Sequence, residues 1–130
     1  MLSVSSYPVS AIEAAAARFG GQLEAFRALG PVPQGFARNY FQMLVLALDH
    51  SFMHRARGQE GKDGNAANEV RLLANGILDN DGRMPKDNQI KYDPARSLTG
   101  LAIGDEIVLD ADRFERLVDA FLEEIARRYP

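Results

Sequence analysis

Two histidines four positions apart are the first residues in this sequence that could do chemistry. His50 and His54 are the only histidines among the 130 residues, and on a helix this spacing places both imidazoles on one face. Zinc proteases of the H-E-x-x-H type use that arrangement, but Ser51 stands where their catalytic glutamate is required. Zinc-protease chemistry is therefore excluded.

Glu69 is the carboxylate that we expect nearest to this pair, with Asp63 as an alternative. Two imidazoles and one carboxylate can bind a divalent metal such as zinc, iron or nickel. The same set, His50, His54 and Glu69, could instead line a cavity for a small organic ligand. A third interpretation is structural: the histidine face points towards the core, and Glu69, a backbone carbonyl or a tyrosine accepts hydrogen bonds from the imidazoles. The sequence leaves the three interpretations open.

A second candidate site is the glycine-containing stretch 61–65, which leads into an expected helix. Free backbone N–H groups at the start of a helix bind anions, and nearby cationic side chains add to the attraction. The alternative is a tight loop in which Asn65 caps the helix, and the acidic Glu60 and Asp63 favour that alternative. The residues predicted to form the anion site are Lys62, Gly64, Asn65 and Arg57.

Other catalytic and binding motifs are absent from the sequence. No serine lies in a G-x-S-x-G turn, the phosphate-binding Walker spacing is missing, and the stretch 79–82 lacks the flanking carboxylates of a calcium loop. The absence of cysteine removes disulfides, thiolate metal sites and cysteine nucleophiles. The net charge of -3 argues against nucleic acid or an anionic membrane as a partner, because both need clustered Lys and Arg.

Length and composition are those of one globular domain covering residues 1–130. Hydrophobic residues make up 46% and charged residues 25% of the chain, which is typical of a single folded unit. The longest apolar run, 43–48, is far shorter than the ~20 residues of a membrane helix. The first 20 residues lack the pattern of a secretory signal. We therefore expect a cytoplasmic domain with no membrane segment.

Apolar residues recur at helical spacing in four segments. Ser10 and Glu13 have the spacing of a capping box, so the first helix is expected at 10–29. The third helix is expected at 66–79. Asp110 is a typical N-cap residue and predicts the start of a fourth helix, which carries a strong apolar stripe.

The second expected helix, 34–57, is apolar around most of its circumference. Arg38, Gln42 and Asp49 fall on one narrow stripe, which we interpret as the solvent-facing side. A helix with this pattern is expected to be buried on nearly every side.

The pattern changes from helical spacing to alternation between the third and fourth helices, which is typical of short strands. Gly104 and Asp105 are expected to form a hairpin turn. The predicted fold class is therefore mainly α: a four-helix core with a small antiparallel β-hairpin or sheet inserted before the last helix, α+β by strict count. The alternating pairs are Ile90 and Tyr92, Leu101 and Ile103, and Ile107 and Leu109.

Three stretches of the chain resemble a family of bacterial proteins described only as hypothetical. They are LDHSFMHR at 48–55, GKDGN at 61–65 and NEV at 68–70. The resemblance covers about the last two-thirds of the chain. It implies no activity, cofactor or partner.

These features together favour a non-enzymatic interaction module that forms a homodimer. The first helix has an alanine-rich surface beside its apolar stripe, and the second is more apolar than its neighbours in a monomer can readily cover. No cofactor is expected. The alternative is a metal- or small-ligand-binding protein or enzyme that uses His50, His54 and Glu69. The alanines are Ala11, Ala14, Ala15, Ala25 and Ala28.

Overall fold

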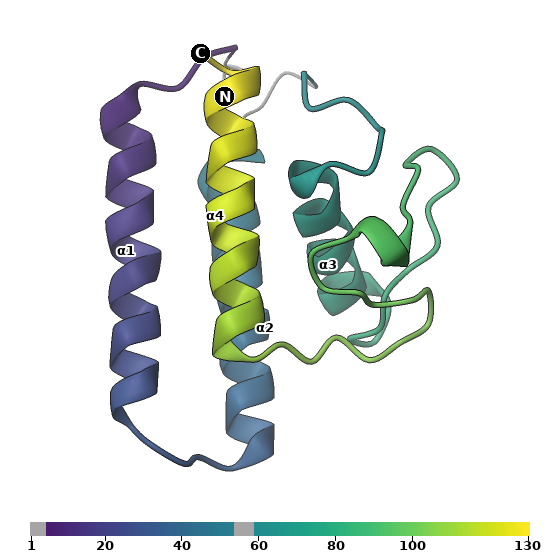
Figure 1. The fold of residues 1–130 in the computed structure, drawn as a ribbon. Helices are drawn as coiled ribbons and strands as arrows, with labels where there is room; N and C mark the ends of the chain where they lie inside the picture. The colour runs from purple at the N-terminus through teal and green to yellow at the C-terminus, as the bar shows by residue number, and fades with distance from the viewer. Residues whose placement is uncertain (1–4, 54–58) are drawn as a thin grey trace.

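The computed structural model describes residues 5–53 and 59–130, and in these residues the chain forms four α-helices (Figure 1). A short 3-10 helix, η2 (Pro94–Arg96), lies in the long connection before the last helix. None of the described helices combines the length and the apolar character that crossing a bilayer requires. The helices are α1 (Val9–Ala28), α2 (Gln34–Phe52), α3 (Ala66–Asp79) and α4 (Ala111–Arg128).

The last helix, α4, is the central element of the bundle. It packs against α1, α2 and α3, and Figure 1 shows it in front of α2, between α1 and α3. The Asp110 side chain caps α4 by accepting a hydrogen bond from the Arg113 N–H at 2.7 Å, as its residue type predicts. Its apolar side chains recur every three or four positions and therefore point into the core. The buried residues of α4 are Phe114, Leu117, Val118, Phe121, Leu122 and Ile125.

The first helix, α1, begins without the capping box expected from Ser10 and Glu13. Pro8 occupies the N-cap position and no side chain caps the helix start. The Pro8 carbonyl accepts hydrogen bonds from the N–H groups of Ala11 and Ile12. Proline limits the backbone to a narrow range of φ, here -66°, so the helix is entered in a defined direction without a polar cap.

The second helix, α2, is buried on one side and exposed on the other. Phe41 and Leu48 are buried, whereas Phe36 is 47% and Met43 57% exposed. The expectation of a helix buried on nearly every side is therefore wrong. The contacts of α2 with α3 and α4 bury the side that carries Phe41 and Leu48 and leave the opposite side open.

The polar stripe of α2 is a docking surface within the molecule. Arg38 and Asp49 each form an ion pair of 3.3 Å with a residue outside α2. Gln42 donates a hydrogen bond to the Ile107 carbonyl at 3.0 Å. All three polar side chains belong to half-buried residues, which corrects the prediction that they face solvent. Periodicity separates the two faces of a helix, but a polar face can also pack when its groups find partners.

The segment between α3 and α4 contains no strand in the part of the chain that the structure describes, so the predicted β-hairpin is wrong. An isolated antiparallel bridge joins Arg83 to Glu106. The turn at Gly104 is present, with a φ of 90° and a hydrogen bond of 3.0 Å from the Asp105 N–H to the Ala102 carbonyl. The chain on either side of this turn does not continue as a ladder.

The alternating apolar residues of this segment are explained by burial without strand pairing. Leu101, Ile107 and Leu109 are buried in the core between the helices. The Ile107 N–H donates to the Gly82 carbonyl at 2.8 Å and the Ala102 N–H to the Asp105 side chain at 2.8 Å, so the predicted strands do not pair with each other. Alternation indicates that one face of a segment is covered, whereas a sheet also requires a second backbone in register.

Candidate functional site

Glu69 is buried in the first turn of α3 and is 1% exposed. Its carboxylate accepts three hydrogen bonds from the connection that follows η2. The donors are the N–H of Leu98 at 2.9 Å, the N–H of Thr99 at 3.0 Å and the hydroxyl of Thr99 at 2.6 Å. Because a buried carboxylate requires such partners, we conclude that Glu69 attaches this connection to α3.

The histidines that sequence reasoning placed beside Glu69 belong to α2 and to the stretch after it. His50 is exposed and lies on the same side of α2 as Met43. The interpretation that this face points towards the core is therefore wrong. His54 lies outside the described residues. In residues 5–53 and 59–130, no group of three or more His, Cys, Asp or Glu is arranged to hold a metal ion, and a metal site that includes His54 stays a prediction.

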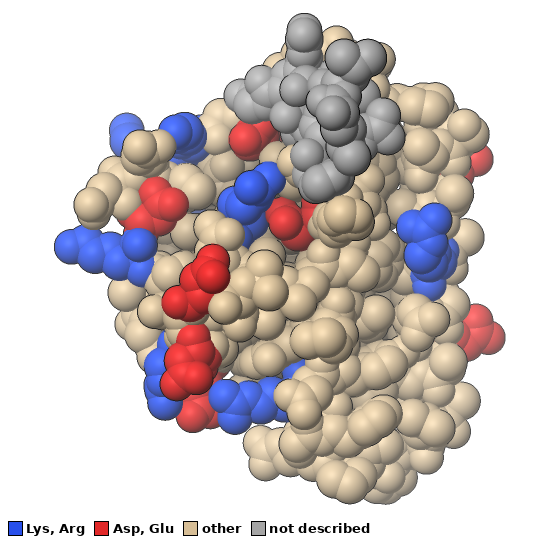
Figure 2. Space-filling view, turned by 180° about the vertical axis from the view of Figure 1, so that it is seen from behind, with Lys and Arg blue, Asp and Glu red and all other residues tan. Residues whose placement is uncertain are grey.

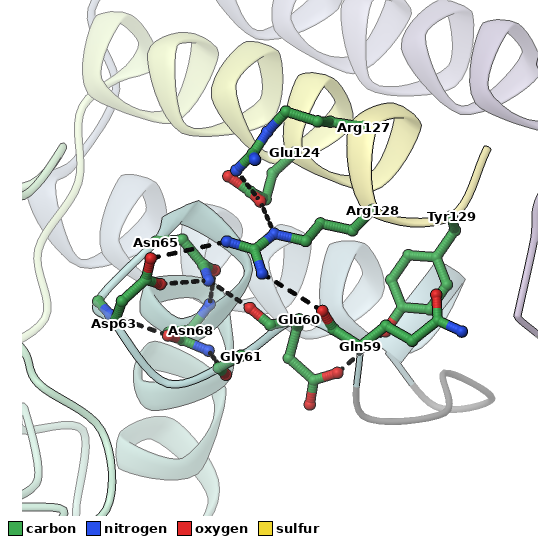
Figure 3. A network of polar contacts seen from close by, with 11 residues as sticks. Gln59, Glu60, Gly61, Asp63, Asn65, Asn68, Glu124, Arg127, Arg128 and Tyr129 are labelled. Atoms are coloured by element: carbon green, nitrogen blue, oxygen red, sulfur yellow. Dashed lines mark hydrogen bonds and ion pairs between the residues drawn. The ribbon is translucent and has the colours of Figure 1, made fainter.

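The predicted anion loop before α3 is closed by its own side chains (Figure 3). The Asn65 Oδ1 accepts a hydrogen bond from the Asn68 N–H at 3.0 Å, so Asn65 caps α3 as the alternative interpretation expects. The Gly64 N–H donates to Asn68 Oδ1 at 3.0 Å, and Asn68 Nδ2 donates to the Gly61 carbonyl at 2.9 Å. The Gly64 N–H that an anion would bind is therefore engaged within the loop.

The remaining members of the predicted anion site do not gather around the loop as free cations. The ammonium group of Lys62 donates to the side chain of Gln89, and Arg57 lies outside the described residues. Asn65 Nδ2 also donates to Asp63 Oδ1 at 2.7 Å. This hydrogen bond is the main cause that lowers the pKa of the Asp63 carboxyl. A negative charge at Asp63 opposes an anion at this position.

The guanidinium of Arg128 connects the end of α4 to this loop (Figure 3). Its Nε lies 2.5 Å from Glu124 Oε2, and its Nη2 lies 3.6 Å from Asp63 Oδ2. Its Nη1 donates to the Gln59 carbonyl at 3.4 Å. These contacts join α4 to residues on both sides of Gly61, so Arg128 acts as a clamp on the loop.

Tyr129 fixes the same loop from the next position. Its side chain is fully buried, and its hydroxyl donates to Glu60 Oε2 at 2.9 Å. Burial is the main cause that raises the pKa of the Tyr129 hydroxyl, and the Glu60 carboxylate raises it further. The Tyr129 ring contacts Tyr7, whose N–H donates to the Tyr129 carbonyl at 2.9 Å. The start of α1, the end of α4 and the loop before α3 therefore meet at Tyr129.

No local pattern in the sequence indicates this convergence. Arg128 carries the ordinary signature of a cation at a helix end, and Tyr129 continues the apolar stripe of α4. Their partners, Glu60 and Asp63, precede them by more than 60 positions. We identify no acid, base or nucleophile in this network that is left without a structural role. We therefore interpret the network as a set of tertiary contacts that hold the loop before α3 against α4.

A different kind of candidate site is the exposed side of α2, which we call the outer face. None of its side chains is an acid, a lysine or an arginine, and both charged residues of α2 point to the flank that meets α3 and Glu106. In Figure 2, which views the side on which α2 lies, charged residues gather on the left and the lower right is almost free of them. The outer face consists of Phe36, Asn39, Met43, Ala47 and His50.

The side of α1 that adjoins α2 extends this surface. Ala14, Gly21 and Ala25 are exposed there, and Tyr40 of α2 donates from its hydroxyl to the Gln22 side chain. Nearer to the start of α1 the two helices leave a groove of about 430 Å³. The groove is lined mainly by small and uncharged residues, with Arg18 as its charged member. The outer face and the adjoining side of α1 thus form one broad, weakly charged surface.

Comparison of the chain with protein-family models, with curated proteins and with solved structures found no match. The resemblance to hypothetical bacterial proteins therefore stays a prediction.

Proposed function

We propose that this protein is a non-enzymatic interaction protein that forms a homodimer through the outer face of α2. The observation that carries the proposal is the exposure of Phe36 and Met43, 47% and 57%, on a helix face without a charged side chain. Large apolar side chains that gather on one exposed face are typical of a surface that binds another protein.

The size of the surface supports a dimer that uses both α2 and the adjoining side of α1. The 19 residues of α2 give a strip about 28 Å long, and two neighbouring helices are about 20 Å wide. The resulting area is on the order of 600 Å² per protomer, whereas specific interfaces bury about 800 Å² per partner. We therefore expect a modest interface with a dissociation constant in the micromolar range, because small interfaces are often weak.

A second copy of this chain is the partner that fits the electrostatics best. The outer face offers no fixed charge that would select an oppositely charged protein. A second copy presents the same uncharged face, so the two surfaces meet without repulsion between like charges. The polar groups of Glu69 and of the loop before α3 are engaged within the molecule, so the proposal assigns structural roles to them.

Light scattering after size-exclusion chromatography tests the proposal. At 100 μM, well above the expected dissociation constant, the chain of 14.3 kDa should elute with about twice that mass. The variant Met43→Glu should elute as a monomer, because it places a carboxylate in the centre of the face. Leu78→Glu is the matched control, since Leu78 is 66% exposed on α3, outside the outer face, and this variant should remain a dimer.

Two results would overturn the proposal. One is a wild-type monomer at this concentration. The other is a dimer that Met43→Glu leaves intact or that Leu78→Glu disrupts equally, because either outcome would place the contact elsewhere.

A further inference from the structure

The residues of the outer face are spaced symmetrically about Met43, which is also the midpoint of α2. Along the chain the steps between them are three, four, four and three positions. Asn39 and Ala47 each lie four residues from Met43, and Phe36 and His50 each lie seven residues from it. At 1.5 Å per residue these offsets are about 6 Å and about 10.5 Å along the helix axis.

From this spacing we infer the register of the dimer: the two α2 helices pack antiparallel, with the two-fold axis between the two Met43 side chains. This inference rests on the proposed function, because it assigns the orientation of the same interface. In this register Met43 meets Met43 of the second copy. Phe36 lies at the level of His50 across the interface, and Asn39 lies at the level of Ala47.

Side-chain size favours this antiparallel register over a parallel one. Antiparallel packing places the Phe36 ring against the His50 imidazole at the two outer levels. At the inner levels it places the small side chain of Ala47 against the medium-sized side chain of Asn39. A parallel pair would instead place Ala47 against its own copy and leave a gap, which costs contact energy. It would also place two His50 rings together and align the helix dipoles in the same direction.

The flanks of α2 are compatible with this arrangement. Arg38 is paired with Glu106 at 3.3 Å and Asp49 with Arg71 at 3.3 Å, on the side of the helix away from the outer face. Neither charge must be desolvated for the two outer faces to meet. The contact along Phe36, Met43 and His50 therefore carries no cost from a buried unpaired charge.

Disulfide cross-linking can read the register directly, because the chain contains no cysteine. We would introduce single cysteines and oxidise the protein under mild conditions at a concentration where the wild type is dimeric. Met43→Cys should form a covalent dimer in most of the chains, since the two sulfurs would lie on either side of the axis. Phe36→Cys alone should not form a covalent dimer, because the two copies of residue 36 would be about 21 Å apart along the helix axis. A disulfide needs Cα atoms within about 7 Å.

The double variant Phe36→Cys, His50→Cys keeps Met43 in place and should cross-link as efficiently as Met43→Cys. Leu78→Cys reports random collision, because its side chain is exposed outside the outer face. It should give the same low yield as Phe36→Cys.

The outcomes separate this inference from the proposed function. If light scattering shows a dimer but Phe36→Cys cross-links alone, the antiparallel register centred on Met43 is wrong. If the wild type is a dimer and neither Met43→Cys nor the double variant exceeds the Leu78→Cys yield, the register is also wrong. A monomeric wild type would instead contradict the proposed function itself.

Discussion

Glu69 shows how one buried carboxylate can order a stretch of chain without regular secondary structure. Its two oxygens accept three hydrogen bonds from Leu98 and Thr99 while the residue is 1% exposed. Hydrogen bonds to a charged acceptor are stronger than those between neutral groups. Glu69 of α3 therefore holds the start of the connection between η2 and α4, at Leu98 and Thr99.

Replacing Glu69 by Gln should destabilise the protein by about 2 to 3 kcal/mol, because the amide group presents an N–H₂ to donors that need an acceptor. Urea unfolding of the wild type and of the variant measures this difference. Glu123→Gln is the control, since Glu123 is exposed on α4 and its replacement should change stability by no more than about 0.5 kcal/mol. Equal stability of the two variants would show that the carboxylate of Glu69 is not required.

Gly64 is a second residue whose type the tertiary structure requires. Its φ is +86°, and a Cβ atom there would lie 2.1 Å from the Lys91 carbonyl oxygen. Gly104 has a similar φ of +90°, but a Cβ atom there would meet nothing within 4 Å. At both positions the positive φ favours glycine, which has no Cβ atom. At Gly64 there is in addition no room for a side chain.

Gly64→Ala should therefore destabilise the fold by at least about 2 kcal/mol more than Gly104→Ala, because the two substitutions share the backbone strain and differ in the clash. Chemical denaturation of both variants measures the difference in unfolding free energy. Similar values for the two would mean that the loop before α3 moves away from Lys91 at little cost.

At the scale of elements, α4 is the helix around which the other helices pack. It contacts all three other α-helices, and Phe121 lies near its middle, fully buried, with its ring centroid 6.0 Å from that of Phe52. A side chain in this position links α4 to α2 through the core. If the Phe121 side chain is truncated, no single neighbouring side chain can fill the space that it leaves unless a helix moves.

Phe121→Ala should destabilise the protein by about 3 to 5 kcal/mol through the cavity that it leaves. Glu123→Ala, two positions along the same helix, should change little because Glu123 is exposed. Guanidinium unfolding followed by circular dichroism gives both values. A comparable loss in both variants would contradict the assignment of the buried face of α4.

At the scale of the whole molecule, the outer face of α2 is an apolar surface that the isolated chain leaves uncovered. Phe36 and Met43 remain about half exposed although the same helix buries Phe41 and Leu48. In the proposed homodimer, a second copy of the chain covers these side chains. Folding and association are then linked, because the unfolded chain is monomeric and the native protein is not.

The melting temperature should therefore rise with protein concentration, by about 2 to 4 °C for each tenfold increase above the dissociation constant. Differential scanning calorimetry at 10 and 100 μM measures the shift. Met43→Glu removes the linkage and should melt at the same temperature at both concentrations. A wild-type melting temperature that does not depend on concentration would argue against the dimer.

The four helices could be predicted from the sequence because the signals for helix formation are local. Apolar spacing and the Asn65 and Asp110 caps depend on residues within a few positions of one another. The predicted bounds 66–79 of α3 agree with the structure, as does the start of α2 at Gln34. Composition and spacing also excluded thiol chemistry and the zinc-protease motif.

What only the tertiary structure decided is which partner each face and each polar group meets. The alternation before α4 was compatible with a hairpin, yet the Ile107 N–H donates to the Gly82 carbonyl instead of to a strand across the turn at Gly104. The polar stripe of α2 packs inward and its outer face is exposed, because a pattern of periodicity does not specify which side a neighbour will cover. Contacts between residues more than 60 positions apart, such as Tyr129 with Glu60, leave no local pattern in the sequence.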